Sequence, residues 1–256
     1  MQSLPNYPSQ WQCLMNHLGQ WQGTFTEVSP LGTVGQSRPS VVTLAGCDEN
    51  RRIRQTIVVA GNRQVLEYGG LGRGILLCAD GAFSQGSLQW GPLGEFGAEL
   101  GLIDGDQRVR CALVYENSQC RHLTLIREQR GAGRLGQGER HLITQLYPDW
   151  RTPAALSGGL TRQRSAAQVT LRWQLETETG VWCGVHQADH RYEQGHYRLL
   201  VLEPEIWVWF PPRVPQGVAF HLGLLWRGQA LLRRYDRTGA WVDLTQVQGV
   251  VVADGY

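Results

Sequence analysis

The sequence predicts an all-β protein made of two consecutive antiparallel β-barrels with one short N-terminal helix. Three observations lead to this fold class. Short runs in which apolar and polar residues alternate recur along all 256 residues, as expected for half-buried strands. The 32 glycines are spread over the whole chain, which suits many turns. Asp-Gly and Gly-Asn pairs separate several of the runs, and these residues accept the positive φ angles of tight hairpin turns.

The N-terminal element is predicted to be a helix over Trp11–Leu18, which we place as a plug under the first barrel. The first strand follows directly with Gly19-Gln-Trp21-Gln-Gly23. A glycine followed two residues later by a tryptophan is how the first strand of lipocalin-like (calycin) barrels opens. The glycine lets the backbone cross the end of the barrel, and the tryptophan fills that end. Gly19, Trp21 and Gly23 are therefore candidate structural residues.

The first lipocalin-like barrel is predicted to cover residues 1–128 with about nine short strands. After the first strand, the alternating runs lie at residues 41–44, 53–59, 64–68, 74–77, 82–90, 96–103, 109–115 and 123–127. Short turns link them, which favours an up-and-down antiparallel barrel over a parallel sheet. In such a barrel an arginine on a late strand can stack on the plugging tryptophan through a cation–π contact. Arg127 is our candidate for stacking on Trp21.

Residues 129–139 contain four glycines and few side chains to bury, so we predict a linker between two domains there. A second barrel is predicted over residues 140–256, with strands at 141–147, 168–175, 181–186, 197–202, 206–210, 218–227, 230–235 and 240–247. Trp150 and Arg151 follow a proline and an aspartate, and we expect them to brace a kinked strand end. Trp241 lies near the end of the second barrel and is a further candidate structural residue.

Composition and charge exclude several functions. All 24 basic residues are arginine, which rules out a lysine Schiff base or a phosphate-loop lysine. The formal net charge is only +2 and the arginines form no long run, which argues against a nucleic-acid surface. No apolar run approaches about 18 residues, the six cysteines form no Cys-x-x-Cys pair and no basic signal segment starts the chain. We therefore expect a soluble, cytoplasmic protein without membrane insertion.

A metal site is not predicted, although four residues in the second half suggest one at first sight. Cys183 and His186 are an odd number of residues apart on one predicted strand, so their side chains face opposite sides. His190 and His196 fall in a polar hairpin, where ordinary surface histidines are expected.

A catalytic group is not predicted either. Asp104 and Asp106 bracket one turn, and Glu203 and Glu205 bracket another, so both pairs are expected to be solvated turn residues. No serine lies in a Gly-x-Ser-x-Gly nucleophile motif. We therefore expect a non-enzymatic protein with no catalytic residue and no cofactor.

The segment Ile206-Trp-Val-Trp-Phe210 is apolar on both faces of its predicted strand. Trp207 and Trp209 share one face. Such a strand is either buried on both sides or exposes an aromatic pair, and tryptophan is enriched at binding hot spots. Both interpretations remain open from the sequence, and Trp207 and Trp209 are our candidate binding surface.

Seven motifs occur along the chain in the order known from one protein family: Trp11-Gln-Cys-Leu, Leu18-Gly-Gln-Trp-Gln-Gly-Thr-Phe-Thr, Ile53-Arg-Gln-Thr, Gly81-Ala-Phe-Ser-Gln-Gly, Glu95-Phe-Gly-Ala-Glu-Leu-Gly-Leu-Ile, Tyr147-Pro-Asp-Trp-Arg-Thr and Arg234-Tyr-Asp-Arg-Thr-Gly-Ala-Trp-Val. The chain resembles the cyanobacterial and chloroplast two-barrel, lipocalin-like family, a domain of unknown function whose plant member is the chloroplast ATP synthase biogenesis factor. The likeness is dense over residues 11–126 and thins over residues 155–230.

The resemblance implies two β-barrels and a non-enzymatic assembly factor for the catalytic head of ATP synthase, with the beta and gamma subunits of that enzyme as partners. A shared fold does not by itself carry function, so two alternatives stay open. One is a carrier of a small apolar ligand such as a fatty acid, carotenoid, heme or bilin. The other is a protein related to the lipocalin-like lyases that attach bilins to phycobiliproteins.

Overall fold

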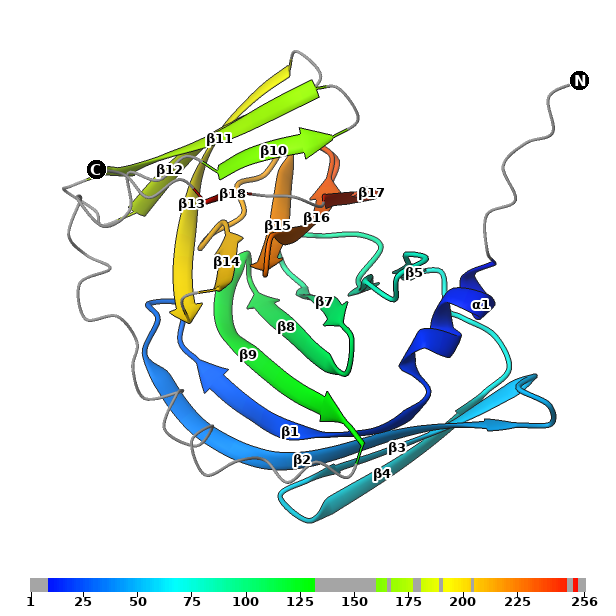
Figure 1. Cartoon of the computed structure of the whole chain (residues 1–256). Coiled ribbons are helices and arrows are strands. Elements are labelled where there is room, and N and C mark those ends of the chain that lie inside the picture. The colour runs from blue at the N-terminus through cyan, green and yellow to red at the C-terminus, as the bar shows by residue number, and fades with distance from the viewer. Residues whose placement is uncertain are drawn as a thin grey trace, which may run out of the picture.

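The computed structural model shows an almost entirely β protein with one short helix, and so confirms the predicted fold class. It describes residues 9–131, 160–164, 167–176, 181–188, 191–203, 205–247 and 251–252, with side chains described for residues 9–131, 197–203 and 205–246. The strands form two nine-stranded antiparallel sheets, the first sheet and the second sheet (Figure 1). No helix in these ranges is long and apolar enough to cross a membrane.

The helix begins at a complete capping box. Helix α1 spans Gln10–Leu14 and continues as a 3-10 turn over Met15–His17. The Ser9 hydroxyl accepts a hydrogen bond from the backbone N–H of Gln12 at 3.2 Å, and the Gln12 side chain accepts one from the Ser9 N–H at 2.7 Å. These bonds satisfy donors that the start of a helix leaves free. The buried side of α1 packs into one end of the first sheet, as predicted for the plug.

The first sheet contains β1 Gly19–Val28, β2 Val34–Cys47, β3 Arg52–Val59, β4 Asn62–Tyr68, β5 Ile75–Leu77, β6 Phe83–Gly86, β7 Glu95–Asp104, β8 Gln107–Glu116 and β9 Gln119–Arg130. Their order in space is β4-β3-β2-β1-β9-β8-β7-β6-β5. Neighbours in space are therefore also neighbours in sequence, except where β1 pairs with β9. β4 and β5 lie at the two ends of this order and do not pair with each other, so the sheet is a curled, open half-barrel (Figure 1).

The curl gives the first sheet an inner face and an outer face. Apolar residues from β2 and β3 join residues from β5, β6 and β7 in one buried cluster, although these strands come from opposite ends of the sheet order: Val42, Leu44, Ile53, Leu77, Phe83 and Ile103. Side chains that meet in this way lie on the concave, inner face. Because successive residues of a strand point to opposite faces, Leu113 and Tyr115 of β8 lie on the outer face.

The second sheet contains β10 Leu160–Arg164, β11 Ala167–Glu176, β12 Val181–Ala188, β13 Arg191–Glu203, β14 Ile206–Phe210, β15 Phe220–Trp226, β16 Gln229–Tyr235, β17 Trp241–Val247 and β18 Val251–Val252. Its order is β17-β16-β15-β14-β13-β12-β11-β10-β18. Strands β14 and β15 are buried along their whole length. Both of their faces are covered, which explains why their sequences are apolar without alternation.

The two sheets share one hydrophobic core. Residues from the outer face of β7, β8 and β9 pack with residues of β13 to β16 in a single cluster that includes Leu113 and Leu123 from the first sheet and Leu200, Val208 and Leu224 from the second. An antiparallel sheet can bury both of its faces when one face curls around its own contents and the other packs on a second sheet.

The predicted domain limits remain predictions. Strand β9 continues to Arg130, two residues into the segment predicted as a linker at 129–139, and the rest of that segment from residue 132 lies outside the described residues. The described strands of the first sheet lie within residues 19–130 and those of the second sheet within residues 160–252. The shared core shows that the two halves pack against each other.

Ion pairs connect the two sheets at the turns that carry the paired carboxylates. Glu203 is buried and binds Arg127 at 2.8 Å, and Arg227 binds Asp104 at 2.8 Å and Glu205 at 3.3 Å. The expectation of merely solvated turn residues was therefore wrong for Glu203, which lies at the contact between the sheets. Asp104 and Glu205 are exposed, and their shared arginine joins the first sheet to the second.

Arg233 of β16 makes a buried polar contact between the sheets. It is 0% exposed. Its Nε donates to the Tyr235 hydroxyl at 2.6 Å, Nη1 donates to Ser84 Oγ at 3.1 Å and to the Gly74 carbonyl at 3.3 Å, and Nη2 donates to the Ser87 carbonyl at 3.0 Å. Three of these four partners belong to the first sheet and its loops. The guanidinium group, with donors fixed in a planar fork, thus joins β16 to the hairpin around β6.

We expect Arg233→Lys to lower the free energy of unfolding by about 3 kcal/mol, because one ammonium group cannot reach these acceptors and leaves buried oxygens unpaired. Urea denaturation measures this change. Arg234→Lys is the matched control, since Arg234 follows in the same strand but pairs with Asp243 at a side-chain exposure of 34%, where the expected cost is about 1 kcal/mol or less. Equal losses of unfolding free energy in the two variants would contradict a stabilising contact between the sheets at Arg233.

Candidate functional site

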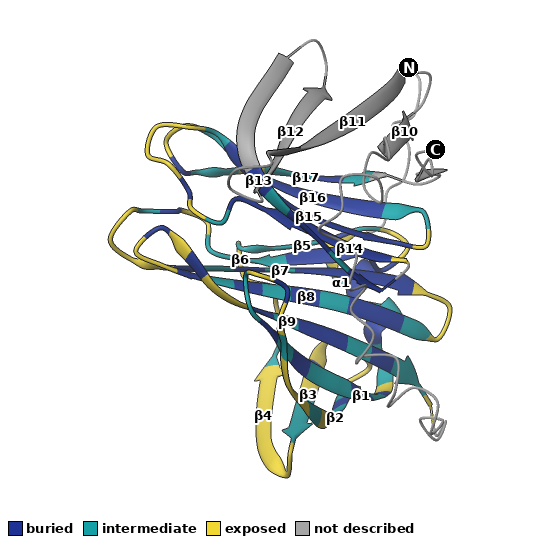
Figure 2. Cartoon of the chain, turned by 90° about the vertical axis from the view of Figure 1, so that its left-hand side faces the viewer, coloured by how far each residue is buried: buried dark blue, intermediate teal, exposed yellow. Residues whose placement is uncertain are grey.

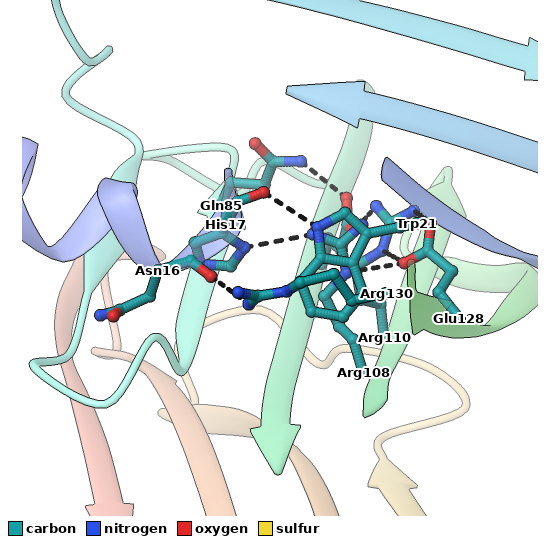
Figure 3. A network of polar contacts seen from close by, with 9 residues as sticks. Asn16, His17, Trp21, Gln85, Arg108, Arg110, Glu128 and Arg130 are labelled. Atoms are coloured by element: carbon teal, nitrogen blue, oxygen red, sulfur yellow. Dashed lines mark hydrogen bonds and ion pairs between the residues drawn. The ribbon is translucent and has the colours of Figure 1, made fainter. Parts of the chain in front are cut away.

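Trp21 fills one end of the first sheet, as its position after Gly19 predicts. The backbone of Gly19 has a φ of 119°, which side chains other than hydrogen rarely allow. Trp21 is 0% exposed, and its ring Nε1 donates to the His17 carbonyl at 2.9 Å. The guanidinium carbons of Arg108 and Arg130 lie 4.2 Å and 4.4 Å from the ring centre (Figure 3). Trp21 therefore lies in contact with two arginines.

The prediction that Arg127 stacks on Trp21 was wrong, because Arg127 lies on the other face of the sheet. Trp21 pairs with Arg130 across β1 and β9, so the residue three positions earlier points outward. Arg127 binds Glu203 of the second sheet instead. The parity of the strand positions was available in the sequence, whereas the contribution of Arg108 required the register between β8 and β9.

Gly23 allows β1 and β9 to approach each other closely. A Cβ atom added at Gly23 would lie 1.7 Å from the backbone oxygen of Arg127, far inside van der Waals contact. The position therefore accepts only glycine without movement of the strand pair.

A layer of four charged side chains lies on the inner face next to Trp21. Glu128 binds Arg108 Nε at 2.7 Å and Arg110 Nε at 2.9 Å, and Arg110 Nη1 binds Glu99 at 2.6 Å. Gln85 donates to Glu99 at 2.6 Å (Figure 3). The side chain of Glu128 has no exposed area, whereas Arg110 and Glu99 retain 11% and 13% exposure. The two guanidinium groups and two carboxylates make the charged layer neutral as a whole.

Burial and pairing shift the pKa values of the charged layer. Burial would raise the pKa of Glu128, but Arg110 and Arg108 outweigh it and hold this pKa below its usual value. Burial lowers the pKa of Arg108 to about 10 despite the attraction of Glu128. Burial opposes the charge of Arg110 too, but Glu128 and Glu99 raise the pKa of Arg110 above its usual value. Glu128, Arg108 and Arg110 are therefore ionised at neutral pH.

His17 is held neutral beside this layer. It is 3% exposed, and burial followed by the nearby charge of Arg108 lowers its pKa to about 3. Its Nδ1 lies 3.2 Å from Arg108 Nη1. An arginine can only donate, so Nδ1 is the acceptor and the ring proton is on Nε2. Neither His17 Nε2 nor Arg108 Nη2 has a hydrogen-bond partner among the described residues.

Beyond the charged layer, the inner face carries apolar side chains that are only partly buried. Phe25 of β1 and Ala112 and Val114 of β8 are of intermediate burial, whereas Ile57 of β3 lies level with Trp21 and packs against the plug cluster. The guanidinium carbon of Arg110 lies 5.4 Å from the centre of the Phe25 ring, so the apolar part begins directly at the charged layer. We call Phe25, Ala112 and Val114 the apolar rim. Plug, charged layer and apolar rim thus follow one another along the inner face.

Trp207 and Trp209 do not form a binding surface, contrary to the prediction. Trp207 is 9% exposed and Trp209 is 0% exposed. A Cβ atom added at Gly223 of β15 would lie 1.8 Å from Cε2 of Trp209, so the indole occupies the space over this glycine. The alternative interpretation from the sequence, a strand buried on both sides, is the one that the structure shows.

The remaining predicted residues lie partly outside the described residues. Trp241 stacks on Arg233, whose guanidinium carbon is 4.0 Å from the ring centre, and donates its ring N–H to the Asp243 carbonyl at 2.8 Å. Trp150 and Arg151 lie outside the described residues, as do the side chains of Cys183 and His186. Within the ranges whose side chains are described, no group of three or more His, Cys, Asp or Glu residues could hold a metal ion.

The fold and site define a class of all-β proteins with a curled antiparallel sheet, a plugged end and a partly apolar inner face. Residues 7–133 match the family described as domain of unknown function (DUF3598), N-terminal. The crystal structure of a protein of unknown function from the DUF3598 family of Nostoc punctiforme PCC 73102 is similar over 94% of this chain and 98% of that chain, with 25% sequence identity and a TM-score of 0.74. No curated protein matches the chain.

Two further solved structures are similar at a lower level. An S-type phycobiliprotein lyase from Guillardia theta covers 47% of this chain and 92% of its own, at 12% identity and a TM-score of 0.32. Kievitone hydratase from Nectria haematococca covers 96% of this chain and 94% of its own, at 7% identity and a TM-score of 0.22. Similarities this low carry no argument about what this chain does.

We expect Glu128→Gln to lower the free energy of unfolding by about 3–5 kcal/mol, because the neutral amide leaves Arg108 buried without a carboxylate. Urea denaturation at neutral pH measures the loss. The control is Glu116→Gln, since Glu116 pairs with Arg121 at side-chain exposures of 51% and 48% and should contribute about 1 kcal/mol or less. A loss at Glu128 no larger than the control would show that the charged layer is not needed for stability.

The pH dependence of stability should report His17. The pKa of His17 is about 3 in the folded chain and about 6.5 when unfolded, so the unfolded chain takes up the proton as the pH falls below about 6.5. Stability should fall by about 2 kcal/mol between pH 7.5 and pH 5. Glu128 does not contribute in this window, because its lowered pKa affects stability only below about pH 4.5.

His17→Gln keeps a hydrogen-bond acceptor and should remove this slope from urea denaturation curves measured at several pH values. His122→Gln is the control, because His122 is exposed and its replacement should leave the slope of the wild type. An unchanged slope in His17→Gln would mean that another group takes up the proton.

Proposed function

We propose that the chain is a non-enzymatic binding protein that holds a small, largely apolar ligand on the inner face of the first sheet. The observation that carries this proposal is the position of the apolar rim. Phe25, Ala112 and Val114 lie on a concave face yet are only partly buried. A ligand that covers these apolar side chains removes them from water, which favours binding.

The charged layer limits what the ligand carries at its inner end. Arg110 and Glu99 are the members of this layer that keep some exposure, so together they offer a donor and an acceptor next to Phe25. Because the layer is neutral as a whole, a fully charged ligand group would meet no excess of opposite charge there. A carotenoid-like ligand, with a long apolar body and a hydroxyl or carbonyl end, fits this arrangement better than a fatty acid does.

Val114→Trp should weaken ligand binding by at least about tenfold, because a large side chain fills the apolar rim. Val41→Trp is the matched control: Val41 is also of intermediate burial but lies on the opposite face of β2, next to the inward-facing Val42. Tryptophan fluorescence quenching and native mass spectrometry would be measured with a carotenoid, a fatty acid, heme and a bilin.

Binding that both tryptophan variants retain, or binding of no compound in this set by the wild type, would contradict the proposed site. Preference for the fatty acid over the carotenoid would contradict the role given to the neutral charged layer. Transfer of the bilin to a cysteine of a partner protein would instead favour the lyase-like alternative.

We propose assembly of the ATP synthase head as a second function, on the strength of the sequence motifs alone. The expected partners are the beta and gamma subunits of that enzyme. An affinity purification from the host lysate tests this directly. Recovery of these subunits by the wild type and by Val114→Trp alike would assign assembly to a surface other than the inner face, and their absence would remove this proposal.

A further inference from the structure

Strand β4 is an exposed edge of the first sheet. Six of its seven residues are exposed (Figure 2), and among the described residues only β3 pairs with it. Two apolar side chains of β4 are open to solvent, Val65 at 45% and Leu66 at 42% exposure. The N–H and C=O groups along such an edge form a template on which another strand can pair.

The edge lacks most of the features by which proteins protect exposed strands. Its sequence from Asn62 to Tyr68 contains no proline and no lysine, and its register with β3 runs without a bulge. Arg63 and Glu67 are the two charged residues of the strand. A charged residue repels an added strand when a residue of the same charge lies opposite it. The register of pairing therefore decides whether Arg63 and Glu67 protect the edge.

We propose that β4 is a homodimer interface, in which β4 pairs antiparallel with β4 of a second copy of this chain around a two-fold axis at Val65. In this register Val65 faces the partner's Val65, and Arg63 faces the partner's Glu67 on both sides of the axis. A two-fold axis repeats each contact, as a closed dimer requires. The two first sheets then form one continuous antiparallel sheet.

The backbone of β4 favours registers in which Arg63, Val65 and Glu67 pair with one another across the two strands. Ala60 and Gly61 form a two-residue turn with φ angles of 49° and 86°, which is typical of a type I′ hairpin. Asn62 next to the turn therefore exchanges backbone hydrogen bonds with β3, as do Gln64 and Leu66. The residues between them do not bond to β3. The backbone N–H and C=O groups that point to the free edge are therefore those of Arg63, Val65 and Glu67.

The register centred on Val65 brings all three outward-pointing residues opposite one another. Each of the three pairs can then exchange two backbone hydrogen bonds. Every other register of the same parity leaves part of the strand unpaired. It also replaces at least one contact between Arg63 and Glu67 by another pair, so backbone overlap and charge favour the same register.

The side chains of β4 also complement a second copy. Glu67 is held by Arg52 and Arg54 of β3 at 2.6 Å each, and Asp48 lies 3.5 Å from Arg52, so this group is neutral before the partner's Arg63 arrives. Arg63 has no ion pair among the described residues. Leu66 lies diagonally across the axis from its copy, within the reach of a long side chain. Both exposed apolar residues of the strand therefore meet their own copies.

Sedimentation equilibrium of the full chain, from micromolar to a few hundred micromolar, tests the dimer. We expect the mass to approach twice the 28.7 kDa of one chain. Arg63→Glu should raise the dimer dissociation constant by about tenfold or more, because two attractive pairs become repulsive. Val65→Pro should weaken the dimer at least as strongly, since it removes an N–H that points to the partner and not to β3.

Val65→Thr is the matched control, because it changes the side chain of the same residue but keeps the N–H and the β-branched shape, and it should keep most of the affinity. Urea denaturation of each variant checks that β4 remains folded. A wild-type chain that stays at the mass of one copy overturns the proposal. So does a dimer that Arg63→Glu and Val65→Pro leave intact, which would place the interface elsewhere.

Discussion

The inner face of the first sheet depends on one carboxylate. Glu128 has no exposed side-chain area and binds both Arg108 and Arg110. Without it, two guanidinium groups from one strand would be buried side by side, and the penalty for removing each from water is several kcal/mol. With it, Arg108 can lie against Trp21, and the ring N–H of Trp21 binds the His17 carbonyl at the end of the helical segment. The plug, the first strand and the charged layer are therefore one connected unit.

The contact between the sheets rests on arginines in the same way. Arg127 and Arg227 bind carboxylates of the opposite sheet, and Arg233 spreads its donors over neutral oxygens around β6. A guanidinium group presents several donors in a fixed plane and stacks on aromatic rings, whereas an ammonium group presents one compact charge. All 24 basic residues of this chain are arginine, and several of them connect the two sheets. The first sheet holds the plug and the charged layer on its inner face, and the outer face of β7, β8 and β9 packs on the second sheet.

The predictions from sequence succeeded for the strand pattern and the plug, and failed for the partner of Trp21 and for the exposure of Trp207 and Trp209. The alternation of residues, the hairpin turns and the Gly19-Gln-Trp21 opening identified the fold class and the plug. Arg127 was the wrong partner for Trp21, although the odd spacing from Arg130 already placed it on the other face. The burial of Trp207 and Trp209 could not be predicted, because an apolar strand has the same sequence whether a second layer covers it or a ligand does.

The sequence by itself determined that this chain is a β protein, where many of its strands turn and that a tryptophan fills the end of the first sheet, because these properties depend on residues close together in the chain. Tertiary structure alone decided that the first sheet stays open between β4 and β5, that the outer face of this sheet shares its core with the second sheet, and that Glu128, Arg108, Arg110 and Glu99 form one layer. These features depend on strand register and on packing between distant segments, and neither is encoded by the spacing of residues along one strand.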